Sequence, residues 1–381
     1  MNTTAPASIS FTLLPDGDAL RRAAERCRAS GLLALDTEFM RVRTFYAQAA
    51  LFQLFDGQQC HLVDPLVIED LSPLAELLSD PSVTKIMHSC SEDLEVCARR
   101  LGALPEPLID TQVLAAFCGH GLSVGYQRLV GLELGVELEK SETRTDWLQR
   151  PLSDAQLKYA AEDVIYLPRL HAAMQAHLEK DPRKFGWAAA ECAGIVPRAR
   201  ARESGVDLAG VGGAWRLDRP RLAALRALHA WRERMARDRD LPRSWVVPDA
   251  ALLRIAEISA TDERALGTVA ELPEAARRRH GKVILAEVAA ALALDPSHMP
   301  EPVPPPPGPA ETRRVKSLRA HVVERSEALG VAPEMLAKRR DLEELVRCAV
   351  SGSTPAHSPL LNGWRREAIG ESLWHLANVS S

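Results

Sequence analysis

The sequence predicts a mixed α/β domain with flanking helices, followed by all-α domains, and three observations support this fold class. Strand-like and helix-like segments alternate over roughly the first 190 residues, and the strand signal then ends. The dipeptide Asp56-Gly57 joins two strand-like runs and favours a tight antiparallel hairpin. The proline-rich stretch 297–311 separates two helical regions. Because 381 residues are too many for one core, we expect domains at 1–195, 209–294 and 312–381, with a linker at 295–311.

The elements of the first region follow from apolar periodicity and capping signals. Ser153 with Gln156 has the spacing of a capping box, and Ser89 with Glu92 has the same spacing. Pro168 is expected to kink the longest helical pattern. These signals place strands at 32–39 and within 49–65, and helices at 71–83, 91–102, 111–119 and 152–179.

The second region reads as short amphipathic helices. Leu222, Leu225 and Leu228 share one helical face, which Trp231 continues. The chain is helical again beyond the proline-rich stretch, over 312–381. The two helical regions share a rough order of helix, loop and helix, which hints at a duplicated module.

Composition excludes several classes of protein. With 46% hydrophobic and 26% charged residues the chain has an ordinary globular composition. No apolar run approaches the ~20 residues that span a bilayer, and the N-terminus shows no secretory signal. The seven cysteines are scattered without a C-x-x-C pair, which is typical of free thiols in a reducing compartment. We therefore expect a cytoplasmic protein with no membrane association.

The charge is distributed unevenly. Residues 1–200 carry 20 basic and 27 acidic side chains, whereas the remainder carries 27 basic and 24 acidic ones. An acidic part beside a slightly basic part fits a metal-binding domain attached to a phosphate-binding one. Solvated helical faces produce such differences by chance, so this observation is weak alone.

Two carboxylates, Asp36 and Glu38, end an apolar run at 32–35 that reads as a buried strand. Residues i and i+2 of a strand point to the same face, so both acids converge on one spot. Two adjacent carboxylates repel unless a cation lies between them, and oxygen ligands suit Mg²⁺ or Mn²⁺. In isolation, a frayed strand end with both acids in solvent is the commoner explanation.

Three further residues complete a possible site. Asp93 is expected near the start of a helix, where the helix dipole favours a carboxylate. Tyr159 and Asp163 are four positions apart and therefore lie on one helical face. Each has an ordinary explanation when taken singly, namely a helix-start acid and a half-buried tyrosine beside a surface acid.

Together these motifs resemble the tyrosine-bearing branch of the DEDD exonuclease superfamily, and the surrounding stretches resemble ribonuclease D. The stretches are "LDTEFMRVRTFYAQAALFQL", "HSCSEDLEV", "DTQVLAAF" and "TDWLQRPLSDAQLKYAAEDVIYL". The stretch "LRALHAWRERMARDRDLPRSWVVPDAALLRIA" resembles the HRDC module. The resemblance implies a ribonuclease-H-like exonuclease domain with two all-α HRDC-like domains behind it, the second more divergent.

The resemblance also implies phosphodiester hydrolysis with two divalent cations, Mg²⁺ or Mn²⁺. Asp36 would bridge the two cations. Glu38 and Asp163 would complete the cation on the nucleophile side, and Asp93 would serve the other. Tyr159 would orient or deprotonate the attacking water, and its ordinary pKa near 10 favours orientation.

Several neighbours are weaker candidates. Thr37, Phe39 and His88 are expected to contact substrate, with Phe39 stacking on a terminal base. A core position for Phe39 and a place behind the site for His88 are simpler alternatives. Trp147 and Arg150 are expected to be structural.

The implied function is a 3′→5′ exoribonuclease that trims the 3′ trailers of tRNA precursors and other small structured RNAs. The tRNA assignment rests on the family alone. The expected partner is RNA, with no protein partner and a monomeric chain. The basic run 277–282 could contact phosphates, although such runs are usually solvated faces.

Two alternatives remain open at the level of the residues. A 3′→5′ exonuclease acting on DNA would use the same five catalytic residues, because they act at the phosphate and not at the sugar. A catalytically dead scaffold would leave the HRDC modules as the working part. Removal of residues 209–381 is expected to reduce discrimination between structured and unstructured RNA more than hydrolysis of a short oligomer.

Overall fold

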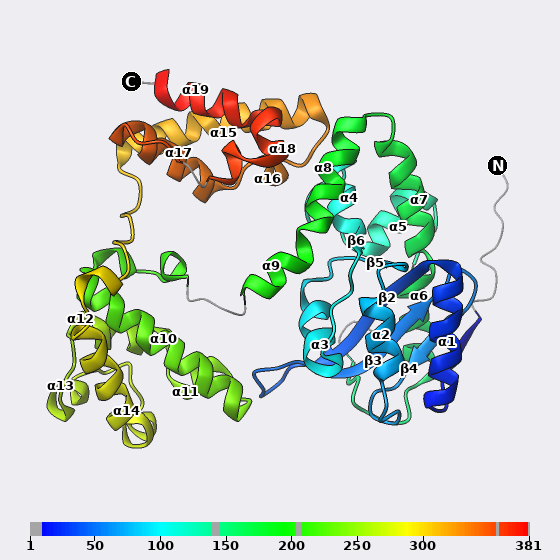
Figure 1. Ribbon diagram of the computed structural model, residues 1–381, viewed down its shortest axis with the longest axis horizontal. Coiled ribbons are helices and arrows are strands. Elements are labelled where there is room, and N and C mark those ends of the chain that lie inside the picture. The colour runs from blue at the N-terminus through cyan, green and yellow to red at the C-terminus, as the bar shows by residue number, and fades with distance from the viewer. Residues whose placement is uncertain (1–9, 139–144, 203–206, 356–357, 380–381) are drawn as a thin grey trace. The chain divides into compact units, whose positions relative to one another are not determined.

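The computed structural model describes residues 10–138, 145–202, 207–355 and 358–379. The chain forms two compact units that do not follow sequence order (Figure 1). One unit combines 1–40 and 48–199 with 307–381, and the other combines 200–306 with the loop 41–47. The last helical region therefore shares a unit with the α/β region, whereas one α/β loop belongs with the first helical region.

Within the described residues, the strands are β1 (Phe11–Leu13), β2 (Leu32–Met40), β3 (Gln48–Phe55), β4 (Cys60–Val63), β5 (Thr84–Met87) and β6 (Leu108–Asp110). They form one sheet in the order β1-β4-β3-β2-β5-β6. The pairs β2–β3 and β3–β4 are antiparallel and the others are parallel. The predicted mixed sheet is confirmed, as is the hairpin at Asp56-Gly57.

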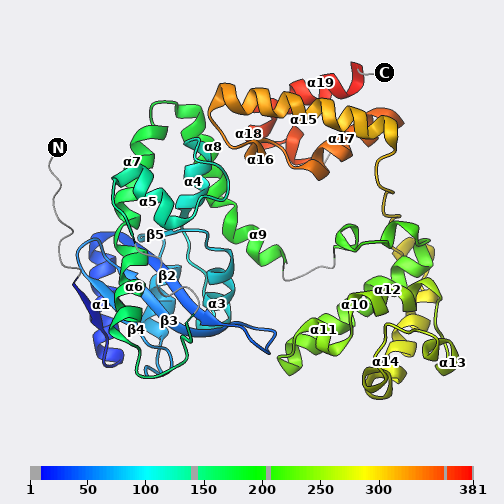
Figure 2. The ribbon, with the colours of Figure 1, turned by 180° about the vertical axis from the view of Figure 1, so that it is seen from behind.

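Helices cover both faces of this sheet. They are α1 (Gly17–Ser30), α2 (Ser72–Ser79), α3 (Ser91–Leu101), α4 (Thr111–Phe117), α5 (Tyr126–Leu134), α6 (Asp154–Ile165), α7 (Leu167–Leu178), α8 (Pro182–Ala193) and α9 (Ile195–Arg202). Helices α1, α2 and α3 lie on one face, and α6 crosses the other against β2, β3 and β4 (Figures 1 and 2). The centre of the sheet is therefore enclosed between α3 and α6.

The capping predictions had different outcomes. The box of Ser153 and Gln156 at the start of α6 is confirmed, with both reciprocal hydrogen bonds present. The box predicted at Ser89 is wrong, because α3 begins after Cys90 and has no side-chain cap. Ser89 instead adopts the left-handed region at φ 59°, and its backbone N–H donates to the carboxylate of Asp110 at 3.0 Å. A long-range hydrogen bond thus displaces the local one.

The predicted kink at Pro168 is a break between two helices. Helix α6 ends at Ile165 and α7 begins at Leu167, with the proline in its first turn. A proline in the first turn loses no helical hydrogen bond, because that N–H has no partner within the helix. The chain therefore restarts a helix at this point.

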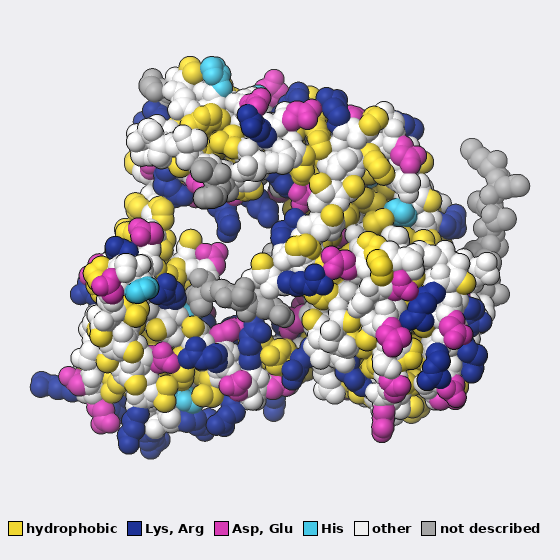
Figure 3. Space-filling view, in the orientation of Figure 1, with side chains coloured by type: hydrophobic (Ala, Val, Ile, Leu, Met, Phe, Trp, Pro, Cys, Tyr) yellow, Lys and Arg dark blue, Asp and Glu magenta, His cyan; other side chains and the backbone are white. Residues whose placement is uncertain are grey.

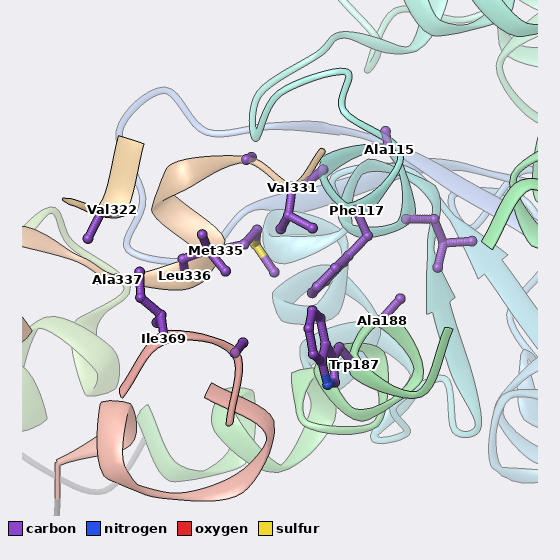
Figure 4. Packing of buried hydrophobic residues seen from close by; sticks show 14 of the residues in the cluster. Ala115, Phe117, Trp187, Ala188, Val322, Val331, Met335, Leu336, Ala337 and Ile369 are labelled. Atoms are coloured by element: carbon purple, nitrogen blue, oxygen red, sulfur yellow. The ribbon is translucent and has the colours of Figure 1, made fainter. Parts of the chain in front are cut away.

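The last helical region packs on the nuclease-like region through a shared hydrophobic core. Trp364 stacks on Trp187 with 5.2 Å between ring centroids and meets the edge of Phe117 at 5.4 Å. Val331 and Met335 point toward Phe117 from the other side (Figure 4). This region consists of α15 (Pro309–Leu329), α16 (Pro333–Leu336), α17 (Arg339–Ser351), α18 (Gly363–Arg365), a π-helical turn (Arg366–Gly370) and α19 (Glu371–Val379).

Polar contacts reinforce this seam. The carboxylate of Glu191 on α8 accepts hydrogen bonds from the Trp364 indole at 2.9 Å and the Arg365 guanidinium at 2.5 Å. The backbone N–H of Ala332 donates to the carbonyl of Ala116 at 2.8 Å. Partly buried polar pairs of this kind help to fix the register of an apolar interface.

The other unit has its own core. Leu222, Leu225 and Leu228 are fully buried, and Trp231 is nearly so, as the shared helical face predicts. The helices of this unit are α10 (Arg219–Arg239), α11 (Arg243–Val246), α12 (Asp249–Glu257), α13 (Glu263–Gly267) and α14 (Glu274–Leu292). None of the helices in the described part of the chain is long and apolar enough to cross a membrane.

The loop 41–47, between β2 and β3, is held in this second unit. Phe45 is buried in its core, with the guanidiniums of Arg237 and Arg243 over the ring. The carboxylate of Asp240 accepts the backbone N–H groups of Phe45 and Tyr46, both at 3.0 Å. These contacts make the loop part of the helical unit.

Candidate active site

The central strand β2 carries Asp36 and Glu38 on one face. The sequence places the end of this strand close to the two acids. In the structure the strand continues to Met40, with a bulge after Glu38. Its pairing with β5 stops at Ala34, whereas its pairing with β3 continues. The acids therefore lie where one edge of β2 has lost its neighbour, which leaves room for a site beside a rigid strand.

Helix α6 brings Tyr159 and Asp163 to the same place. Single oxygens of Asp36, Glu38 and Asp163 all lie within 4.8 Å of one another. The Tyr159 hydroxyl lies beside the Asp163 carboxylate and opposes the rise of its pKa, and the Tyr159 ring lies 6.1 Å from that of buried Trp147. The helical pair Tyr159 and Asp163 and the strand pair Asp36 and Glu38 thus lie in one cluster.

Asp93 lies in the first turn of α3, as expected, and is buried. It approaches from the opposite side of β2, where Thr37 donates its hydroxyl to the Asp93 carboxylate at 2.5 Å. Asp93 is not within the tight group of three carboxylates, yet its charge acts on Asp36. Thr37 thus holds the fourth acid in place.

Burial is the largest cause that raises the pKa of each acid in the cluster, and the charges of neighbouring carboxylates add to it. Burial is the largest cause for Asp36, followed by the charges of Asp93, Asp163 and Glu38, and its pKa lies well above the ordinary value. Burial, followed by the charges of Asp163 and Asp93, raises the pKa of Glu38 to about 9. Burial raises the pKa of Asp163 to about 7, against the opposing hydrogen bond from Tyr159.

Asp93 and Tyr159 follow the same rule. Burial raises the pKa of Asp93 to about 6, although the Thr37 hydroxyl opposes the shift. Burial and then the charge of Asp163 raise the pKa of Tyr159 above its ordinary value. The tyrosine is therefore a neutral hydroxyl at physiological pH, which fits orientation of a water.

The donor set fits divalent cations of the hard, oxygen-preferring type. Three carboxylates within reach of one ion, in a place where they repel one another, are poorly stable without positive charge. The causes that raise the pKa of Asp36 and of Glu38 are burial and the charges of the other carboxylates. A bound cation would remove this repulsion.

The predicted substrate contacts lie around the cluster. Phe39 is partly buried on β2, directly after Glu38. His88 uses both ring nitrogens within the protein, toward the Thr111 hydroxyl at 2.9 Å and the Val124 carbonyl at 3.0 Å. This is the arrangement of a residue packed behind a site.

Arg150 and Trp147 have the structural role that the sequence predicts. The Arg150 guanidinium binds both carboxylate oxygens of Asp64, at 2.5 and 2.9 Å, and the carbonyls of Trp147 and Ala50. It thereby ties the segment before α6 to the sheet. The tied segment leads into α6, the helix that carries Tyr159 and Asp163.

Two neighbours of the cluster are not apparent from sequence. Tyr126 is half-buried, its hydroxyl donates to the Glu162 carbonyl at 2.8 Å, and burial of the hydroxyl and then the charge of Asp163 raise its pKa. Gln53 is fully buried on β3 directly across from Asp36. Only strand register and helix packing reveal them, since neither has a motif spacing to the acids.

Comparison with known proteins gives consistent results. Residues 12–179 match a 3′-5′ exonuclease family, 221–288 the HRDC domain, and 309–373 the ribonuclease D C-terminal HRDC domain. Ribonuclease D of Pseudomonas paraeruginosa is 40% identical over 98% of both chains. The Escherichia coli enzyme is 39% identical over 97% of this chain and 98% of its own. The chain belongs to the ribonuclease D family.

Structural comparison agrees with this membership. The crystal structure of Escherichia coli ribonuclease D, described as an exoribonuclease involved in structured RNA processing, has a TM-score of 0.83 and 38% identity. It covers 97% of this chain, and this chain covers 98% of it. The predicted exonuclease fold and the two helical HRDC domains are confirmed. The chain is a 3′→5′ exoribonuclease of the DEDD class, and divalent-metal dependence accompanies that class.

Proposed function

We propose that this enzyme removes 3′-terminal nucleotides from tRNA precursors and other small structured RNAs with two divalent cations, Mg²⁺ or Mn²⁺. The observation that carries the proposal is the group of Asp36, Glu38 and Asp163 oxygens within 4.8 Å of one another. Asp36, Glu38 and Asp163 would hold one cation, and Asp36 with Asp93 would hold the other. When bound, such cations lower the pKa of an attacking water and stabilise the leaving 3′ oxygen.

The protein supplies orientation. The Tyr159 hydroxyl is engaged with Asp163 and stays protonated, so its oxygen lone pairs remain to accept a hydrogen bond from the attacking water. The Thr37 hydroxyl fixes the Asp93 carboxylate, which makes Thr37 a positioning residue in our proposal. Phe39, adjacent to the acids, is the candidate platform for the terminal base.

The first HRDC domain would supply phosphate contacts to longer RNA. Arg277, Arg278 and Arg279 are exposed on α14, together with Lys282, and basic side chains gather over this helical unit in Figure 3. Loss of Arg278 and Arg279 together should reduce the salt dependence of tailed-tRNA binding by a slope of up to about 2. An unchanged slope would exclude this face from RNA binding.

The proposed setting is the cytoplasm, where tRNA precursors mature. All seven cysteines are unpaired, which fits a reducing compartment. The limits 1–195, 209–294 and 312–381 remain our proposal for the sequence modules.

The decisive experiment is degradation of a 3′-tailed tRNA transcript beside a matched DNA oligomer. Wild type, Asp36→Asn and Tyr159→Phe are each assayed with Mg²⁺, Mn²⁺ or EDTA. We expect stepwise loss of 3′ nucleotides from RNA, abolished by EDTA. Asp36→Asn should lower the rate by at least about 10²-fold, and Tyr159→Phe by about 10²-fold. Equal degradation of DNA, or activity that survives EDTA, would contradict the proposal.

A further inference from the structure

Gln53 occupies an unusual position in the catalytic sheet. It lies in the middle of β3 and is fully buried. The register places it directly opposite Asp36 on β2 and opposite Leu62 on β4. Directly opposed residues of antiparallel strands share a face, with Cβ atoms about 5 Å apart. Asp36 is therefore its polar neighbour across the sheet, and Glu38 is the diagonal one.

The side-chain carboxamide of Gln53 makes no hydrogen bond to the described residues. Neither its Oε1 nor its Nε2 atom has a hydrogen-bond partner among the described residues. Buried polar groups are nearly always paired, because an unpaired one loses its bonds to water without replacement. A glutamine kept here at that cost needs a partner that the protein by itself does not provide.

The chemistry of an amide suits this place. Its N–H₂ group donates hydrogen bonds but carries no charge, so it adds no repulsion beside the acids and no competitor for a cation. A carboxylate that ligates a metal ion is commonly oriented by a hydrogen bond from a neighbouring group. The backbone N–H of Thr37 opposes the rise of the Asp36 pKa, and lone pairs of the carboxylate remain for a further donor.

We propose that Gln53 is a positioning residue for Asp36, whose carboxylate it orients through its Nε2 donor when the acidic cluster holds divalent cations. The inference rests on the proposed function, because it needs a cation at Asp36. It assigns Gln53 no contact with RNA or with the reacting atoms. In the metal-free protein the unpaired amide lowers the stability of the fold. In the metal-loaded protein it donates a hydrogen bond to the Asp36 carboxylate.

Two opposite effects of one substitution follow. Gln53→Met keeps the length of the side chain and removes both orphaned polar atoms. The metal-free variant should unfold at the same or a higher temperature than wild type. Its affinity for Mn²⁺ should fall by about 10-fold or more. A residue that merely fills the core would show no loss of affinity.

The experiment measures Mn²⁺ binding to the full chain by titration calorimetry, and thermal unfolding in EDTA. The matched control is Ser358→Ala, since Ser358 is also fully buried with an unpaired hydroxyl but lies in the last helical domain. That control should gain stability and bind Mn²⁺ like wild type. Gln53→Leu repeats the test with another side chain, should the methionine not be accommodated.

The measured Mn²⁺ affinities distinguish the role of Gln53 from the proposed function of the acidic cluster. Weaker Mn²⁺ binding by Gln53→Met or Gln53→Leu, with metal-free stability retained, supports the inference. Equal binding by these variants and wild type would overturn the inference while leaving the proposed function intact. Wild type that binds no Mn²⁺ would overturn both, and Asp36→Asn provides the reference for lost binding.

Discussion

The two HRDC domains of this chain are used in different ways. The first, matched over 221–288, surrounds its own core, in which Leu225 and Trp231 are buried. The second, matched over 309–373, completes a core together with Phe117 and Trp187 of the exonuclease domain. One module thus forms its core together with the loop 41–47, whereas its relative shares a core with the helices of the exonuclease domain. Family resemblance of a module does not determine what it packs against.

This difference changes how the helical domains can be tested. Removal of residues 209–381 would uncover Phe117 and Trp187 on the exonuclease domain. A loss of hydrolysis would then report unfolding of the exonuclease core and not a loss of RNA selection. Point substitutions distinguish the two roles more sharply.

The largest expected effect comes from the shared core. Trp364→Ala removes the ring between Trp187 and Phe117 and should destabilise the exonuclease unit by about 3 kcal/mol. Leu225→Ala should destabilise the first HRDC domain by a similar amount, about 2–5 kcal/mol. Thermal unfolding with activity on a short oligomer measures both.

The comparison predicts opposite functional results for the two variants. At a temperature near its midpoint, Trp364→Ala should lose activity on the short oligomer. Leu225→Ala should keep that activity after its own domain has melted. Equal loss in both variants would show that the two units unfold as one.

A second, smaller effect concerns pH. Between about pH 5 and 9 the folded, metal-free protein holds protons on Glu38, Asp163 and Asp93, whose pKa values are raised to about 9, 7 and 6. The unfolded chain binds fewer protons in this range, so stability falls as pH rises. In EDTA the exonuclease unit should melt a few degrees lower at pH 8.5 than at pH 6.

Cations should reverse this trend, because they bind the ionised carboxylates. With saturating Mn²⁺ the midpoint of the exonuclease unit should rise most at pH 8.5. Asp163→Asn should flatten the dependence in EDTA. A transition of the first HRDC unit that shifts equally with pH would place the cause outside the acidic cluster.

The smallest effect concerns the loop 41–47. Asp240 accepts two backbone N–H groups from this loop while in the left-handed region at φ 49°. Asp240→Gly removes the acceptor without backbone strain. Trypsin should then cleave after Arg41 or Arg43 about tenfold faster, the equivalent of about 1.4 kcal/mol.

Asp240→Asn is the matched control, because its amide oxygen still accepts both N–H groups. It should be cleaved at the wild-type rate. Faster cleavage of this variant would mean that charge, and not the hydrogen bonds, holds the loop.

Sequence was sufficient for features that depend on local spacing. Asp36 and Glu38 share a strand face by the period of two, and Tyr159 meets Asp163 by the helical turn. The hairpin signal at Asp56-Gly57 predicted the antiparallel pairing of β3 with β4. These predictions needed no knowledge of the tertiary structure.

Features that join distant segments could not be predicted in the same way. The pairing of Gln53 with Asp36 depends on strand register, and the bond from Thr37 to Asp93 on helix docking. Apolar periodicity shows that α15 has a buried face, but not which domain covers it. The left-handed Ser89 likewise follows from a carboxylate on another strand.

The loop 41–47 gives the chain an interlaced connectivity. The polypeptide leaves the catalytic sheet after Met40, contributes Phe45 to the core of the helical unit, and returns to the sheet at Gln48. A gene for the exonuclease domain alone would encode Phe45 without Asp240, the acceptor of its backbone N–H, which lies 195 positions downstream. If the first HRDC domain were lost or exchanged during evolution, the sequence of the loop 41–47 would have to change with it. Such a requirement favours joint inheritance of the two parts over free shuffling.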